Sequence, residues 1–311
     1  MVDLAGGAAA SLYLATSDGL VVVDTAGSIS ATELAGREIV SVAARGVSLV
    51  VAVAQGGVLR RSGEGWVDLG LESAHVWTVA IGVEGTVYAG TEPAALWRLG
   101  GSAGPEELTG LREVEGYEKW DSPWGAADLP TIVAQEPRIV VGIEVGGVAI
   151  SNDGGATWSA RSTGLYDDVH RVVADDRALY ATTGMGCHRS TDEGRSWVFD
   201  SEGIDRGYTQ GLACAGGAVL ATASSGPPPM WDAGGPEAAI FRADAGDDAL
   251  QWSIVAEGFA GNIDRQALAA DGDLVVAGTT AGEVLVSRDA GRSFEVVATG
   301  LSPITAVAIA E

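Results

Sequence analysis

The sequence predicts an all-β protein, a seven-bladed β-propeller built from four-stranded antiparallel blades. Three observations lead to this fold class. One polar turn motif occurs three times, short apolar strands recur with a period near 40 residues, and strand-like segments near the two ends complement each other. A period of about 40 to 45 residues is typical of one four-stranded blade. Six blades are the alternative if the weak repeat around Val42 is misassigned.

The turn motif has the pattern Ser-x-Asp-x-Gly-x-Ser/Thr-aromatic, and four of its five defined positions, the Ser, Asp, Gly and aromatic residue, are the structural candidates in each of the three copies. These are Ser151, Asp153, Gly155 and Trp158; Ser190, Asp192, Gly194 and Trp197; and Ser287, Asp289, Gly291 and Phe294. An Asp just past a strand accepts hydrogen bonds from the N–H groups that follow, and Gly tolerates a positive φ. We therefore expect a self-capped hairpin turn whose aromatic residue packs against a neighbouring sheet.

The repeated strand gives the number of blades. The first strand of each unit is centred on one of seven anchors: Val42, Val79, Ile132, Val172, Leu212, Leu268 and Val307. Their spacings are 37, 53, 40, 40, 56 and 39 residues, so two units carry insertions. We place these insertions at residues 113–128 and 225–236 of one propeller domain that spans residues 1–311.

The ends of the sequence predict how the ring closes. Three strand-like segments near the N-terminus (SLYLATS, GLVVVD and ISATEL) lack a first strand, and ITAVAIA at the C-terminus is a first strand alone. Together they complete one blade. Closure protects the sheet edges that an open array of repeats would expose.

These turns and the period resemble the Asp-box, or BNR-like, family of β-propellers. The likeness covers nearly the whole chain and is greatest to uncharacterised intracellular propellers of bacteria and haloarchaea. In that family the boxes are structural turns remote from the active site. The resemblance therefore implies a fold rather than an activity.

Charge narrows the choice of partners. The net charge is −24 and Lys119 is the only lysine. Such a surface is typical of halophilic proteins from a salt-accumulating cytoplasm, and an ordinary acidic protein is the alternative. There is no basic stripe to follow phosphates, so we expect no nucleic-acid binding.

Targeting and cysteine patterns favour a cytoplasmic protein. The N-terminal residues lack the basic region of a signal peptide, and no apolar run approaches the roughly 20 residues that span a bilayer. We therefore expect no membrane association. Cys187 and Cys214 lie in different repeats without metal-ligand spacing, and we expect them to be free thiols.

The insertions predict which face carries function. In a propeller, the loops into the first strand and between the second and third strands open on one face, whereas the repeated turns lie on the other. Both insertions fall on the first face, where long loops on a rigid scaffold commonly bind ligands. Their large side chains are Tyr117, Trp120, Trp124, Met230 and Trp231. These stack on a ligand or, alternatively, tuck under their own loops as small cores.

Positions just before each anchor predict the lining of the channel mouth. The polar and aromatic candidates are Glu38, His75, Trp77, Asp128, Asp168, His170, Tyr208, Gln210, Asp264 and Gln266. Glu144 interrupts an apolar strand, VGIEVGG, where other blades have Thr. A buried acid needs a partner, and His170 on the neighbouring blade is the expected one.

Two functions remain open. The first is a non-catalytic scaffold that binds a protein or small molecule at the mouth. The second is a carbohydrate-active hydrolase or lyase, with Glu144 and Asp128 as acid and base and His170 orienting one of them. A sialidase is excluded, because there is no Arg-Ile-Pro signature and Arg37, Arg206 and Arg265 form no evident triad. The lack of the corresponding motifs predicts no metal or cofactor, with Ca²⁺ at the carboxylate-rich mouth as the alternative.

Overall fold

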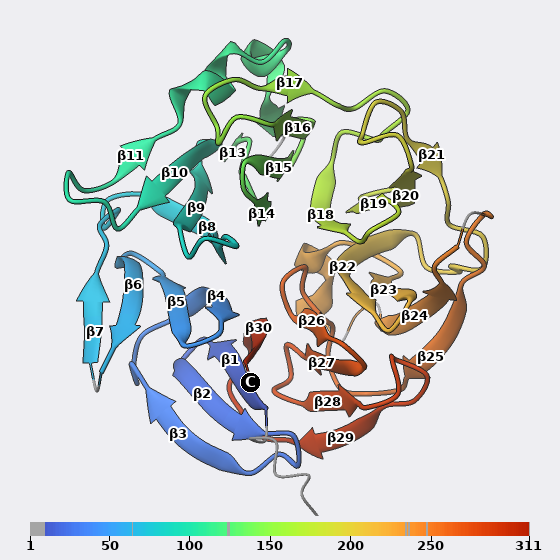
Figure 1. Ribbon diagram of the computed structural model, residues 1–311. Helices are drawn as coiled ribbons and strands as arrows, with labels where there is room; N and C mark the ends of the chain where they lie inside the picture. Colours follow the sequence, from blue (N-terminus) through green and yellow to red (C-terminus); the bar gives the residue numbers. More distant parts are fainter. Residues whose placement is uncertain are drawn as a thin grey trace, which may run out of the picture.

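The protein is a closed seven-bladed β-propeller (Figure 1). The computed structural model describes residues 10–63, 65–122, 125–233, 235, 237–246 and 248–310. Each blade is a four-stranded antiparallel sheet whose first strand lies at the channel and whose fourth strand lies at the rim. All seven anchors from the sequence fall on these first strands, which confirms the seven-blade prediction.

The first four blades in ring order have the following strands. Blade 1 contains β30 (Ile304–Ala310), β1 (Ser11–Thr16), β2 (Gly19–Asp24) and β3 (Ile29–Glu33). Blade 2 contains β4 (Ile39–Arg45), β5 (Ser48–Val53), β6 (Gly57–Ser62) and β7 (Gly65–Asp68). Blade 3 contains β8 (His75–Ile81), β9 (Val87–Glu92), β10 (Ala95–Leu99) and β11 (Glu106–Glu107). Blade 4 contains β14 (Thr131–Gln135), β15 (Arg138–Ile143), β16 (Gly147–Ser151) and β17 (Ser159–Ala160).

The remaining three blades complete the ring. Blade 5 contains β18 (Val169–Ala174), β19 (Leu179–Thr183), β20 (Gly186–Ser190) and β21 (Val198–Phe199). Blade 6 contains β22 (Tyr208–Ala215), β23 (Ala218–Ser224), β24 (Ala239–Asp244) and β25 (Ser253–Glu257). Blade 7 contains β26 (Leu268–Asp271), β27 (Leu274–Gly278), β28 (Val284–Ser287) and β29 (Glu295–Ala298).

Blade 1 closes the ring as the sequence predicts. Strand β30 pairs antiparallel with β1, with Ser11 opposite Ala310 and Leu14 opposite Val307. Leu14 is fully buried among apolar side chains of blades 1 and 7. The last strand of the chain therefore becomes the innermost strand of the first blade.

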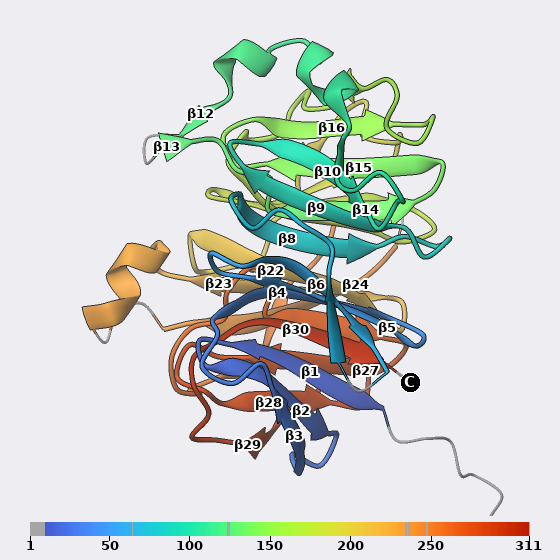
Figure 2. The ribbon, with the colours of Figure 1, turned by 90° about the vertical axis from the view of Figure 1, so that its left-hand side faces the viewer.

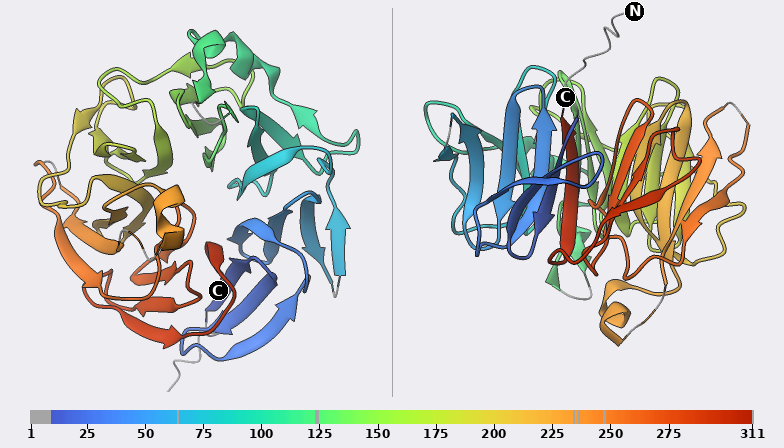
Figure 3. Two further views of the ribbon diagram at one scale, coloured as in Figure 1. Left: turned by 180° about the vertical axis from the view of Figure 1, so that it is seen from behind. Right: turned by 90° about the horizontal axis from the view of Figure 1, so that it is seen from below.

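The insertions add short elements outside the blades. These are the 3₁₀ helices η1 (Thr109–Glu113), η2 (Tyr117–Lys119) and η3 (Pro228–Ala233), and a hairpin of β12 (Asp121–Ser122) and β13 (Gly125–Ala126). The hairpin and η3 protrude on the same side of the disc (Figures 2 and 3). Helix η1 instead lies at the outer rim (Figure 1), and its Leu111 is buried in the core between blades 3 and 4.

The core lies between blades. The described residues form seven apolar clusters, each shared by two neighbouring blades. The inner strands thus form nearly continuous buried runs, as in β19 and β23, where every residue is buried. Such runs are expected for sheets that are covered on both faces.

The three repeated turns have the self-capping that the sequence predicts. In residues 190–197, Ser190 Oγ accepts the Gly194 N–H at 2.8 Å, and Asp192 Oδ1 accepts the Ser196 N–H at 2.9 Å. The turns at residues 151–158 and 287–294 make the same bonds. Gly291 has a φ of +76°, and a Cβ there would lie 2.3 Å from the Leu220 side chain. The glycine therefore serves both the turn and the close approach of the neighbouring blade.

The aromatic residue of each turn packs into the interface with the preceding blade. Trp158 packs between blades 3 and 4, Trp197 between blades 4 and 5, and Phe294 between blades 6 and 7. Trp66 and Trp252 take the equivalent places in blades 2 and 6, which lack the turn motif. The aromatic wedge is thus more widespread than the motif.

In four blades, an arginine on or just after the third strand reaches the outer turn of the next blade. They donate to backbone carbonyls as follows: Arg98 to Gly154 at 2.6 Å, Arg189 to Gly246 at 2.8 Å, Arg242 to Ala290 at 2.9 Å and Arg288 to Thr25 at 2.5 Å. A guanidinium can serve a carbonyl and a carboxylate at once. Arg189 does so, because its Nε lies 2.8 Å from Asp200 Oδ2. The two groups form an ion pair, although the angles between them are not those of a hydrogen bond.

Replacing Arg189 should destabilise the propeller far more than replacing an exposed arginine. Arg189→Met leaves the buried Asp200 carboxylate without its cation, so we expect a loss of about 3–5 kcal/mol in the free energy of unfolding. Arg195 pairs with Glu193 on the surface, and Arg195→Met should cost no more than about 1 kcal/mol. Urea denaturation of both variants measures the difference. Equal losses would contradict the structural role of Arg189.

The turn at Asp192 should contribute to stability against acid. Hydrogen bonds from the Ser196 hydroxyl and N–H lower the pKa of Asp192 to about 2. A lowered pKa stabilises the fold above the unfolded value near 3.8, and this contribution is lost as the pH falls towards 2. Asp192→Asn should therefore flatten the decline in stability between about pH 4 and 2.

Denaturation midpoints across this pH range measure the effect, with Asp176→Asn as the exposed control. Asp176→Asn should leave the acid profile of the wild type unchanged. A profile for Asp192→Asn that matches the wild type would show that this carboxylate is not held by the turn.

Candidate functional site

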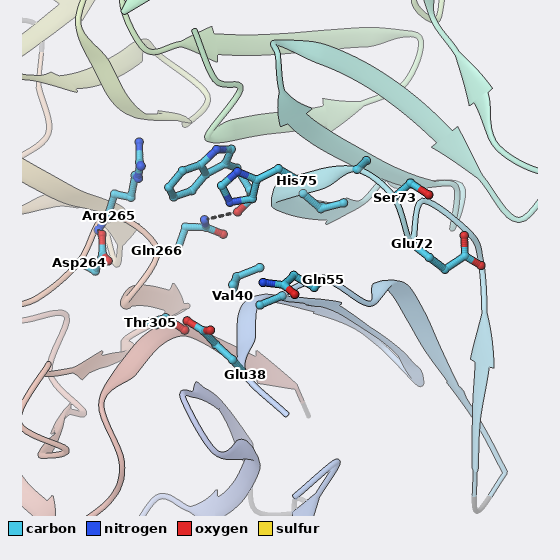
Figure 4. A pocket seen from close by; sticks show the side chains of 14 residues that line it. Glu38, Val40, Gln55, Glu72, Ser73, His75, Asp264, Arg265, Gln266 and Thr305 are labelled. Atoms are coloured by element: carbon cyan, nitrogen blue, oxygen red, sulfur yellow. Dashed lines mark hydrogen bonds between the residues drawn. The ribbon is translucent and has the colours of Figure 1, made fainter. Parts of the chain in front are cut away.

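A cavity opens at the channel mouth on the face opposite the repeated turns. Its volume is about 610 Å³, and its lining comes from blades 1, 2, 3 and 7 and the segments that precede their first strands. Five residues predicted for the mouth line it: Glu38, His75, Trp77, Asp264 and Gln266. In Figure 4 the side chains of Glu38, His75 and Arg265 border this cavity from three different blades.

Glu92 holds the two aromatic rings of this cavity in place. Its Oε2 accepts the Trp77 indole N–H at 3.1 Å and lies 3.0 Å from His75 Nδ1. The two rings are tilted, with centroids 4.8 Å apart. Glu92 follows Thr91 at the end of β9, one residue beyond the strand-end position that the sequence singled out. Sequence reasoning therefore missed it.

Arg265 is the centre of the charged network. Its side chain is 13% exposed, and its guanidinium lies over the Trp77 ring, 4.7 Å from the centroid. Nη1 donates to Glu144 Oε2 at 2.5 Å, and Nη2 lies 3.6 Å from Asp128 Oδ2. Arg265 thus joins an acid of blade 4 to the aromatic wall of blade 3.

The expected pairing of Glu144 with His170 is wrong. Glu144 binds Arg265, whose permanent charge and paired donors suit a carboxylate better than an imidazole does. His170 is committed elsewhere, because its Nδ1 lies 2.6 Å from the Thr209 carbonyl and must donate to it. The sequence feature that could have predicted Arg265 at the mouth is its position between Asp264 and Gln266, which were both predicted to lie there.

His170 lies on the far side of the mouth with Asp168 and Tyr208. It is 1% exposed, and its Nε2 lies 3.5 Å from Asp168 Oδ1 without hydrogen-bond geometry. The Tyr208 ring is 4.8 Å from the imidazole. Gln210 is buried beside this group on β22. Blades 5 and 6 thus contribute a second polar wall.

Asp128 is a buried acid with an altered pKa. Burial raises the pKa to about 6; the Arg265 charge opposes this rise and the Glu144 charge adds to it. Asp128 Oδ1 has no hydrogen-bond partner within the described structure. At mildly acidic pH the Asp128 carboxyl therefore holds a proton.

The inserted loops present less aromatic surface than the sequence suggested. Trp120 is half-buried against the core between blades 3 and 4, and its ring is 4.9 Å from that of Tyr117. Trp231 is also half-buried, and its indole N–H donates to the Gly226 carbonyl. Met230 is 53% exposed. Trp124, the other predicted aromatic residue, lies outside the described residues.

Metal ligation finds no support in the described part of the chain, which has no cluster of three or more His, Cys, Asp or Glu side chains suited to a metal ion. His188 lies on β20, the third strand of blade 5. Cys187 and Cys214 are free. No helix in the described ranges is long and apolar enough to cross a membrane.

The raised pKa of Asp128 should affect stability with a definite sign. The folded state binds a proton more tightly than the unfolded state between about pH 4 and 6, so stability falls as the pH rises through this window. Asp128→Asn removes the titration and should remove this decline relative to the wild type. Chemical denaturation of both proteins from pH 4 to 7 measures it. Parallel curves would contradict a pKa near 6.

Comparison with known proteins supports the fold. No family model matches the sequence, and no curated protein matches it significantly. The structure of YCF48 from Cyanidioschyzon merolae superposes on this chain with a TM-score of 0.58 at 13% identity, over 85% of this chain and 87% of that one.

 A structure of YCF48 bound to D1 peptide superposes with a TM-score of 0.58 at 13% identity, over 93% of this chain and 86% of that one.

A glycoside hydrolase has a similar fold. The GH74 xyloglucanase from Xanthomonas campestris superposes with a TM-score of 0.62 at 16% identity. The match covers 96% of this chain and 52% of that one, so this chain spans about half the length of the xyloglucanase. At these identities the likeness establishes a shared β-propeller fold and nothing about activity.

Proposed function

We propose that this protein is a non-catalytic binding scaffold whose ligand, a segment of a protein partner or a small molecule, enters the cavity at the channel mouth. The observation that carries this proposal is the engagement of Arg265 with both Glu144 and Asp128. A catalytic pair needs one free carboxylate and one acid. Here the guanidinium occupies the carboxylate that would act as nucleophile or base.

The charge of the cavity favours a positively charged ligand. Glu38, Glu72 and Asp264 line it, and the side chains of Glu38 and Glu72 have no hydrogen-bond or ion-pair partner in the described structure. Val40, Ala74 and Val76 add apolar surface. Acidic walls and a net charge of −24 attract a basic segment over a long range, and this attraction weakens with salt.

The structural neighbours are consistent with both open functions. YCF48 carries a bound peptide on the same fold, which supports the use of such a propeller for peptide binding. The GH74 enzyme supports the alternative, a carbohydrate-active hydrolase. The specific observation that favours the alternative is Asp128, a buried carboxyl with a pKa raised to about 6, in the range of a general acid. Glu144 would then have to leave Arg265 during the reaction.

We also propose that the chain is an Asp-box propeller. The supporting observation is the hydrogen bonding of the three repeated turns, in which one Ser and one Asp cap the same backbone groups each time. A halophilic, cytoplasmic protein is the setting that its acidic, lysine-poor composition suggests.

Binding of charged peptides tests the scaffold proposal. Fluorescein-labelled decapeptides of basic, neutral and acidic composition are titrated with the protein, and fluorescence anisotropy is measured at low and moderate salt. We expect the basic peptide to bind most tightly. Glu38→Gln combined with Glu72→Gln should weaken this binding by roughly three- to tenfold, since each lost charge removes a favourable contact.

The matched control removes two carboxylates away from the mouth, by Glu193→Gln combined with Glu295→Gln, and should bind as the wild type does. If both double variants bound the basic peptide equally weakly, the net charge of the protein would explain the loss of affinity. That result would contradict a binding site at the mouth. A parallel assay with xyloglucan and aryl glycosides tests the alternative. Turnover that is lost in Glu144→Gln and Asp128→Asn would establish a hydrolase instead.

A further inference from the structure

A second cavity lies in the channel on the face of the repeated turns. Its volume is about 550 Å³. Its walls are the far halves of the first strands, β4, β8, β26 and β30, with one side chain each from β14 and β18. These strands surround the central opening in Figure 1. The mouth cavity and this one therefore occupy opposite ends of the channel.

Arg171 on β18 lines this second cavity and is half-buried there. In the described structure its side chain has no hydrogen bond and no ion pair, and its Nε is buried and unsatisfied. Burial, and second the charge of Arg265, lower the pKa of Arg171 to about 10, so the guanidinium remains charged at neutral pH. A charge that is partly withdrawn from water and has no partner is costly unless something compensates it.

Among the described residues, the rest of the wall supplies no buried negative charge. The other charged residues that line the cavity are Arg45 and Asp271, and both are exposed at its rim. Arg45 Nε donates to the Ile81 carbonyl at 3.2 Å. The first strands are the edge strands of their sheets, so N–H groups on their channel side are available as further donors. Gln266 and Ala306 form an isolated bridge across one such edge.

We propose that this end of the channel binds a small oxyanion, a phosphate or a carboxylate, with the Arg171 guanidinium as its main ligand. A planar guanidinium presents paired donors that match two oxygens of an oxyanion. The bound anion supplies the charge that no described side chain supplies to Arg171. This site is separate from the mouth cavity and does not depend on the function proposed for it.

Thermal unfolding in different anions tests the proposal. The full chain is titrated with sodium phosphate or sodium acetate, and sodium chloride keeps the ionic strength constant. We expect a saturable rise in Tm of roughly 2–5 °C with phosphate, acetate or both. A response to phosphate alone assigns an inorganic oxyanion, and a response to acetate alone assigns a carboxylate ligand.

Three variants locate the effect. Arg171→Met should lose the rise in Tm, and in chloride alone it should be at least as stable as the wild type, because an unpaired buried charge is gone. Arg171→Lys should keep a weaker rise, since it retains the charge without the paired donors. Arg195→Met removes an exposed arginine and should respond as the wild type does.

Two results would overturn the proposal. One is an identical response of the wild type and Arg171→Met to both anions, which would mark a general salt effect. The other is the absence of any saturable response of the wild type to phosphate and to acetate. A strongly destabilised Arg171→Met would show that Arg171 has a structural role. That result would also contradict the proposal that its charge lacks a partner in the ligand-free protein.

Discussion

The pairing of β30 with β1 is the constraint on which the rest of the structure depends. It joins residues at opposite ends of the chain in a continuous antiparallel ladder and places apolar side chains of blades 7 and 1 in one core. Without it, two blade faces and a sheet edge would be exposed to water. Closure also brings the start of β30 beside β4 and β26, and so forms part of the mouth cavity.

Two kinds of side-chain contact recur between neighbouring blades of this ring. An aromatic wedge packs into the interface with the preceding blade, and an arginine reaches a carbonyl in the outer turn of the following one. Both contacts use side chains that combine apolar surface area with hydrogen-bond donors. The preference for arginine over lysine agrees with this use, because a guanidinium can donate to a carbonyl and a carboxylate at the same time.

Two arginines in the channel show how the surroundings of a residue decide the role of the same type of side chain. Arg265 is saturated by Glu144 and Asp128 and stacks on Trp77, so it organises the mouth. Arg171 is half-buried and has no partner among the described residues, so its positive charge is left for a ligand. The same kind of charge is therefore neutralised by carboxylates at one end of the channel and is free to bind an anion at the other.

The sequence by itself determined the blade number, the strand order, the closing blade and the self-capped turns, because these follow from local periodicity and from hydrogen bonds within a few residues. It also placed Glu38, His75, Trp77, Asp264 and Gln266 at the mouth, since equivalent positions of a repeat meet at the channel. Only the tertiary structure decided the partners. Arg265 and Glu144 are 121 residues apart and on different blades, and their contact depends on the ring geometry and on side-chain conformation rather than on any local pattern. The isolation of Arg171 is likewise a property of the assembled channel, because a charge is unpaired only with respect to everything that surrounds it.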